Sequence, residues 1–206
     1  ICHGWHRPKE VRSGRMSLSS DDTLECPQCG HAQVTTVWSS VNVTLDPHLR
    51  TRLFDETLIA FNCRTCSYHC RVETDLLYHD MDKRLAIWLK YPDEDGLIRV
   101  DDRVNRGIAT LWSDYTCRVV GSYEELIEKI KIADAELDDL EVELIKVIVC
   151  LAGQINMSSR FLFHGLTKSI LGKRSFIFAQ GEGDSVKEKS CPLSPHESLL
   201  REAIPK

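Results

Sequence analysis

The sequence predicts an α+β fold: a zinc-ribbon-like antiparallel β domain with an inserted short helix, followed by a helical hairpin and a C-terminal β-hairpin. Two Cys-x-x-Cys motifs, at 26–29 and 63–66, each lead into a segment of β-forming residues, and 122–152 carries apolar residues at helical spacing. Four parts are expected along the 206 residues: a disordered tail or upstream extension at 1–20, the zinc-ribbon-like domain at 21–92, an α+β portion with the helix hairpin at 97–180, and a flexible tail at 181–206.

The region between the two cysteine pairs is predicted to form a strand, a short helix and a second strand. Residues 33–44 are rich in Val and Thr, which favour a strand. Asp46-Pro47 predicts a helix over 48–54, because an Asp side chain accepts hydrogen bonds from free backbone N–H groups and Pro fits the first helical position. The strand at 58–62 then brings the chain to the second pair.

Two further strands complete the predicted β domain. They are expected at 69–74 and 85–90, joined by a connection at 76–82 whose turn is the polar tripeptide Tyr78-His79-Asp80. Residues 91–96 combine Pro, Gly and three acidic residues, a composition typical of a linker.

Beyond this linker the pattern becomes helical. After a strand at 115–120, Ser122 and Glu125 form a capping-box motif that predicts a helix start. The apolar face of this helix comprises Leu126, Ile127, Ile130 and Ala133, and its outer side Glu124, Glu128 and Lys131. A second helix from 138–141 places four apolar residues on one face: Val142, Ile145, Val149 and Ala152. Strands at 161–164 and 175–179 form the C-terminal hairpin.

The two cysteine pairs predict one metal site. A Cys-x-x-Cys turn places two sulfurs on one side of a tight loop, and two such loops make a tetrahedral thiolate site for Zn²⁺. The predicted ligands are Cys26, Cys29, Cys63 and Cys66. The 33 residues between Cys29 and Cys63 exceed the usual spacing, which the inserted helix explains. Four thiolates leave zinc no open coordination position, so the expected role of the metal is structural.

Other uses of the cysteines are less consistent with the pattern. A redox-active pair sits at a helix N-terminus, whereas both pairs here lead into strands. His69 or Cys70 could replace a ligand, but alignment of the two motifs places Cys70 opposite Gln33, off the metal. Nine cysteines, an odd number without a secretory signal, argue against a disulfide-stabilised scaffold, and Cys117 and Cys150 are expected as buried thiols.

Three segments resemble the bacterial CpXC-domain family over about residues 24–150. They are CPQCGHAQVTTVWSSVNVTLDPHLRTRLFDETLIAFNCRTC, LLYHDMDKRLAIWL and SYEELIEKIKIADAELDDLEVELIK. The resemblance implies metal binding at the same four cysteines and implies no known reaction. The second motif departs from the expected pattern with Arg64 in place of Pro and Ser67 in place of Gly. A serine in a positive-φ turn costs stability there.

Composition limits the function further. The net charge is −5, and no basic patch of the kind that binds phosphates is evident outside the basic tail at 1–15, which argues against nucleic acid. No apolar run approaches the length of a membrane span. His79 and Asp80 are the compact group suited to acid–base catalysis, but a turn pair is the preferred interpretation.

The sequence therefore favours a cytoplasmic, non-catalytic zinc protein that serves as a binding or scaffold module for a protein partner or for self-association. One candidate for self-association is the apolar face of 126–149. The alternatives are a nucleic-acid-associated regulator and a hydrolase or thiol oxidoreductase.

Overall fold

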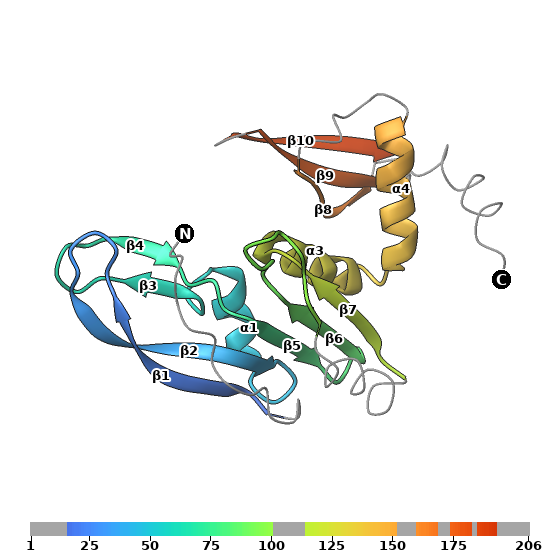
Figure 1. Cartoon of the computed structure of the whole chain (residues 1–206). Coiled ribbons are helices and arrows are strands. Elements are labelled where there is room, and N and C mark those ends of the chain that lie inside the picture. The colour runs from blue at the N-terminus through green and yellow to red at the C-terminus, as the bar shows by residue number, and fades with distance from the viewer. Residues whose placement is uncertain (1–15, 101–113, 152–159, 169–173, 183–184, 193–206) are drawn as a thin grey trace. The chain divides into compact units, whose positions relative to one another are not determined.

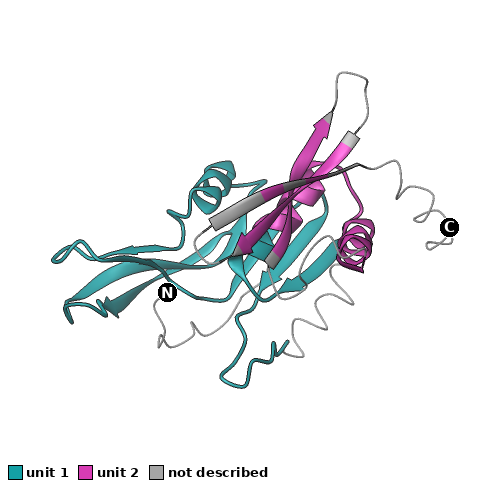
Figure 2. Ribbon diagram, turned by 90° about the horizontal axis from the view of Figure 1, so that it is seen from above, with its two compact units in different colours: residues 1–126 teal, residues 127–206 magenta. Residues whose placement is uncertain are grey.

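The computed structural model describes residues 16–100, 114–151, 160–168, 174–182 and 185–192. These form two compact units, 1–126 and 127–206, drawn in different colours in Figure 2. The predicted α+β class is confirmed, with sheets, helices and a C-terminal β-hairpin. Of the tail expected at 1–20, residues 1–15 lie outside the described residues. In the described ranges no helix is long and apolar enough to cross a membrane.

Unit 1 is built on a five-stranded sheet in the order β1-β2-β5-β6-β7. The strands are β1 (Leu18–Glu25), β2 (Ala32–Asn42), β5 (Leu76–Asp80), β6 (Leu85–Leu89) and β7 (Thr116–Val120). Pairing is antiparallel for β1 with β2 and for β5 with β6, and parallel for β2 with β5 and for β6 with β7. All residues of β5 and β6 are buried, so these strands form the centre of the unit.

A helix and a small hairpin accompany this sheet. Helix α1 (Pro47–Phe54) begins at a proline as expected and buries Leu49 and Leu53, although Asp46 makes no side-chain capping bond. Strands β3 (Ala60–Asn62) and β4 (His69–Arg71) pair with each other as a separate two-stranded sheet. In Figure 1 this hairpin runs alongside the β1–β2 ribbon.

Helix α3 (Tyr123–Asp134) starts in unit 1 with the predicted capping motif and continues into unit 2. Ser122 Oγ accepts the Glu125 N–H at 3.3 Å, and the Glu125 carboxylate accepts the N–H of Gly121 at 2.8 Å, one residue earlier than a capping box requires. At the same end Arg71 lies over the Tyr123 ring and pairs with Glu124 at 2.6 Å.

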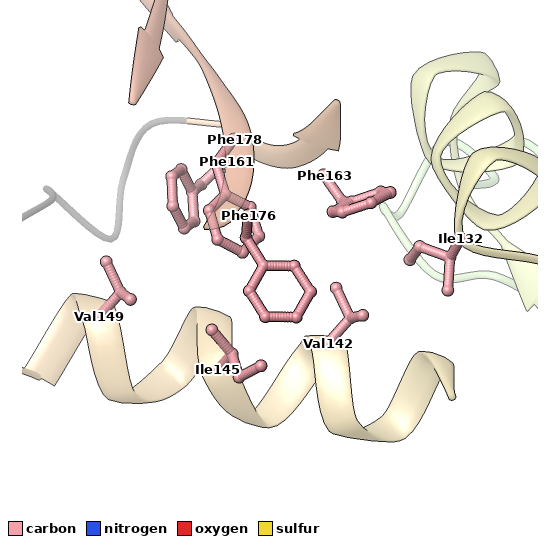
Figure 3. Close-up of a cluster of buried hydrophobic side chains, with 8 residues drawn as sticks. All are labelled: Ile132, Val142, Ile145, Val149, Phe161, Phe163, Phe176 and Phe178. Carbon is pink, nitrogen blue, oxygen red and sulfur yellow. The ribbon is translucent and has the colours of Figure 1, made fainter. Parts of the chain in front are cut away.

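Unit 2 packs helices on a three-stranded sheet. Helix α4 (Asp139–Leu151) follows α3, and the strands β8 (Arg160–Lys168), β9 (Arg174–Glu182) and β10 (Ser185–Pro192) lie in the order β10-β9-β8. Figure 3 shows its core, in which Phe176 faces Val142 and Ile145 of α4. The full core comprises Ile132, Val142, Ile145, Val149, Phe161, Phe163, Phe176 and Phe178. This sheet covers the α4 face that the sequence offered for self-association.

Several expectations need correction. The prediction of a connection at 76–82 is wrong, because Leu76–Asp80 forms strand β5. Strand β1 was not predicted, and it begins within the tail expected at 1–20. Glu128 is not on an outer face but only 2% exposed. The tail at 181–206 contains β10, which pairs with β9. The boundary between the two units falls after residue 126 and not in the linker predicted at 91–96. The reason is that β7, which follows that linker in the chain, pairs with β6 of unit 1.

Candidate metal centre

The first cysteine pair forms a tight turn between β1 and β2. In this first knuckle (residues 26–31), the Cys26 N–H donates to the His31 carbonyl at 2.9 Å and the Gly30 N–H donates to the Cys26 carbonyl at 2.8 Å. Gly30 has a φ of 72°, a left-handed conformation that glycine adopts without a Cβ clash. The turn thereby places Cys26 and Cys29 on the same side of the loop.

The second knuckle (residues 63–68) repeats this turn between β3 and β4. The Cys63 N–H donates to the Tyr68 carbonyl at 2.8 Å, which matches the first knuckle at an offset of 37 residues. Ser67 occupies the position of Gly30 with a φ of 58°, as the sequence predicts for this turn. The Thr65 N–H points at Cys63 Sγ, 3.4 Å away. Two equivalent turns therefore face each other, one from each ribbon.

The four cysteine sulfurs come together in one group, all within 4.8 Å of one another. Cys26 Sγ lies 3.6 Å from Cys66 Sγ, and Cys29 Sγ lies 3.7 Å from Cys63 Sγ. A tetrahedron with metal–sulfur bonds of about 2.3 Å has edges of about 3.8 Å. The donor set and its spacing therefore fit a tetrahedral metal ion.

Burial and hydrogen bonding distinguish the four thiols. Cys26 and Cys63 are buried, Cys66 is half-buried and Cys29 is exposed. Burial raises the pKa of Cys63. Hydrogen bonds from the N–H groups of Thr65 and Cys66 and from neighbouring thiols lower it by more, so that the pKa is about 6. For Cys66, the N–H of Tyr68 lowers the pKa, while burial and the other three thiols raise it to about 12. The lowered pKa favours the thiolate form of Cys63, which is the form that binds metals.

A small apolar cluster lies behind the sulfurs and joins the two ribbons. Its buried residues are Leu24, Cys26, Val37, Phe61, Cys63 and Val72, with Cys66, Tyr68 and Cys70 at the margin. One polar side chain, Gln33, bridges the same two ribbons with hydrogen bonds to the backbone on both sides of Cys63. Sequence reasoning assigned Gln33 no role, and a single glutamine after a turn carries no motif that would have revealed one.

The rival cysteine and histidine ligands are not part of the group. Cys70, on β4, is disulfide-bonded, in contrast to the reduced thiols expected from the sequence. His69 is exposed on the same strand. Both pairs lie in turns between strands, not at a helix N-terminus, as expected. Cys117 and Cys150 are not disulfide-bonded and are half-buried, less enclosed than predicted.

His79 and Asp80 lie on β5 and not in a turn. His79 is 2% exposed and Asp80 is 8% exposed. Asn42 Oδ1 accepts the N–H groups of Thr44 and Leu45, so its Nδ2 is the donor to His79 Nδ1, at 3.3 Å.

The Asn42 contact fixes the tautomer of His79. Because Nδ1 is an acceptor, Nε2 carries the proton and donates to the Tyr115 hydroxyl at 3.3 Å. Asp80 Oδ1 accepts the N–H of Lys83 at 3.0 Å and so holds the turn that follows β5. Both side chains make structural contacts in the sheet.

Comparison with known proteins identifies one family. The family model described as CpXC protein matches residues 24–146. That range contains both knuckles, α1, strands β2 to β7, α3 and part of α4, but only the last two residues of β1. No curated protein and no solved structure matches the chain.

Proposed function

This chain belongs to the CpXC protein family, and we propose that it is a non-catalytic zinc protein whose metal stabilises a binding or scaffold module. The observation that carries the proposal is the spacing of the four sulfurs, with two pairs at 3.6 and 3.7 Å in a group no wider than 4.8 Å. The ligands would be Cys26, Cys29, Cys63 and Cys66.

Zinc in this group would have a structural role. When bound, it supplies four metal–thiolate bonds that join the β1–β2 ribbon to the β3–β4 hairpin. The two ribbons belong to different sheets, so no ladder of backbone hydrogen bonds connects them. Four cysteine ligands fill a tetrahedral site and leave no position for a substrate, which supports a non-catalytic role.

Zinc and iron both suit four tetrahedral thiolates, and the proposal commits to zinc. Within the described residues the group consists of the four cysteines alone, which is the donor set of many structural zinc sites. Elemental analysis separates the two metals directly, since bound iron would also colour the protein.

The charges on the helices support a protein partner or self-association more than a nucleic acid. Lys129 pairs with Glu143 at 2.7 Å and Lys146 pairs with Glu128 at 3.0 Å, so the charges of these two lysines are already matched by carboxylates of unit 2 and not presented to phosphates. The net charge of −5 opposes binding to phosphates. We propose a cytoplasmic location, where such thiols bind metals. Weak retention on heparin is expected, and strong salt-dependent retention would favour the nucleic-acid alternative.

The decisive experiment is the metal content of the purified protein, measured by elemental mass spectrometry and paired with thermal melts before and after a strong chelator. About one zinc per chain and a lower Tm after chelation are expected. Cys117→Ser is the matched control, because Cys117 is a cysteine of the same unit that lies outside the group and forms no disulfide. Absence of metal, with an unchanged melt, would refute the proposal and favour a thiol oxidoreductase.

A further inference from the structure

Gln33 bridges the two knuckles through its side-chain amide. It lies near the start of β2, four residues after Cys29, and is 9% exposed. Its Nε2 donates to the Asn62 carbonyl at 2.9 Å, and its Oε1 accepts the Arg64 N–H at 2.9 Å. Both backbone groups are adjacent to Cys63, one on each side.

This pair of hydrogen bonds constrains the backbone at Cys63. In a sheet, a neighbouring strand forms hydrogen bonds with a carbonyl and an N–H that lie two residues apart. Here the side chain of Gln33 alone forms hydrogen bonds with both groups. The carbonyl before Cys63 and the N–H after it are held, so the direction of the Cα–Cβ bond of Cys63 is fixed. Gln33 belongs to the β1–β2 ribbon, which carries the first knuckle, so its two hydrogen bonds also set the separation of the two turns.

Comparison of the two knuckles shows that the hydrogen bonds of Gln33 are not part of the repeated turn but an addition to it. At the offset of 37 residues, the counterpart of Gln33 is Cys70, which has no side-chain amide and is disulfide-bonded. The two turns share the backbone bond between their first and sixth residues, at 2.9 and 2.8 Å. The extra constraint therefore acts on the second knuckle, whose turn contains Ser67 with a positive φ.

We infer that Gln33 is a positioning residue of the metal centre, which holds Cys63 in the arrangement that binds the ion. The inference rests on the proposed function. Removal of the amide leaves the Asn62 carbonyl and the Arg64 N–H without this partner and frees the backbone around a ligand. Outer partners that orient metal ligands contribute about tenfold to hundredfold to metal affinity.

The test compares Gln33→Ala, Gln33→Met and the control Gln28→Ala in the full chain. Gln28 is an exposed glutamine inside the first knuckle, so its truncation changes the same residue type in the same region. The rate of Zn²⁺ transfer to a chromogenic chelator is measured, together with the affinity by competition. Gln33→Ala is expected to release zinc about tenfold to hundredfold faster, and Gln28→Ala at the rate of the unchanged protein.

Gln33→Met separates the two hydrogen bonds from packing. Methionine has nearly the same length and no charge, but it can neither donate to the Asn62 carbonyl nor accept the Arg64 N–H. It is expected to release zinc about as fast as Gln33→Ala. A packing role would instead leave Gln33→Met close to the unchanged protein, which would overturn the inference.

The possible results distinguish a failure of this inference from a failure of the proposed function. If the unchanged protein binds one zinc and Gln33→Ala releases it at the same rate, the inference fails while the proposed function stands. If the unchanged protein binds no zinc, the proposed function itself fails. A general loss of folding is recognised by melts in excess chelator, where Gln33→Ala and Gln28→Ala are expected to agree within a few degrees. A lower Tm for Gln33→Ala alone would assign Gln33 to the fold and overturn its role at the metal.

Discussion

Replacement of Lys146 by methionine removes the cation that neutralises the buried carboxylate of unit 2. Lys146 Nζ lies 3.0 and 3.2 Å from the two carboxylate oxygens of Glu128, which also accepts the N–H of Phe163 at 2.5 Å. Glu128 is 2% exposed, whereas the side chain of Lys146 is 15% exposed. Methionine retains most of the aliphatic packing, so the change isolates the charge.

The expected cost at neutral pH is about 3 kcal/mol. Loss of one partner of a buried ion pair destabilises by roughly 3–5 kcal/mol, because the other charge stays buried. The lower end applies here, since Lys129 is the residue next to Glu128 and interacts with its charge. Glu143, the second carboxylate near Lys146, keeps its 2.7 Å contact with Lys129.

The same variant should be less destabilised in mild acid. Burial raises the pKa of Glu128 above its ordinary value of 4.5, and Lys146 partly opposes this rise. Without Lys146 the folded-state pKa rises further, so the folded protein retains the proton to higher pH than the unfolded chain does. Stability is therefore lost as the pH rises through the raised pKa, and the deficit should be larger at pH 8 than at pH 5.

Urea denaturation at both pH values, followed by far-UV circular dichroism, measures the deficit. Hydrogen exchange of peptides from β8 adds a local readout, because the Phe163 N–H depends on Glu128. Lys131→Met is the control, since it removes a lysine of α3 with only a 3.4 Å contact to His164. Equal deficits at pH 5 and pH 8, or a deficit no larger than that of the control, would refute the reasoning.

Three further substitutions test the centre and the second core. Cys63→Ser should lose the bound zinc and lower the Tm in thermal melts, while Cys117→Ser should do neither. Ser67→Gly should stabilise the zinc-loaded protein by about 1 kcal/mol in urea melts, because φ is 58° there; a lower stability would contradict this. Phe178→Ala should cost about 3–5 kcal/mol by chemical denaturation, whereas Leu151→Ala, 76% exposed, should change stability by less than about 0.5 kcal/mol.

The cysteine group could be predicted because its signals are local. Each pair lies in a single short turn, 26–31 or 63–68, and the turn hydrogen bonds close within five residues. The helices also follow from local signals, since Pro47 starts α1 and the Ser122–Glu125 motif starts α3. Backbone conformation and apolar spacing are sufficient for these features.

The sequence failed where partners distant in the chain decide the environment. Tyr78-His79-Asp80 has the polar residues of a turn, yet His79 is buried because Asn42, 37 residues earlier, accommodates its ring nitrogen. Helical spacing places Glu128 opposite Leu126, but Phe163 of β8 and Lys146 of α4 provide the partners that allow its burial. Such residues cannot be recognised before the packing of three elements is known.

The cysteine group lies at one end of β2, which indicates that loss of the metal loosens only the structure near that end. Residues 32–40 of β2 pair with β1, and only Ser40–Asn42 pair with β5, so the knuckles and the centre of the sheet lie at opposite ends of one strand. Strands β5 and β6 are buried and paired without any help from the cysteines. Chelation should therefore accelerate hydrogen exchange in β3 and β4 and leave β5 and β6 protected. Uniform acceleration throughout unit 1, measured by mass spectrometry, would show instead that the metal supports the whole unit.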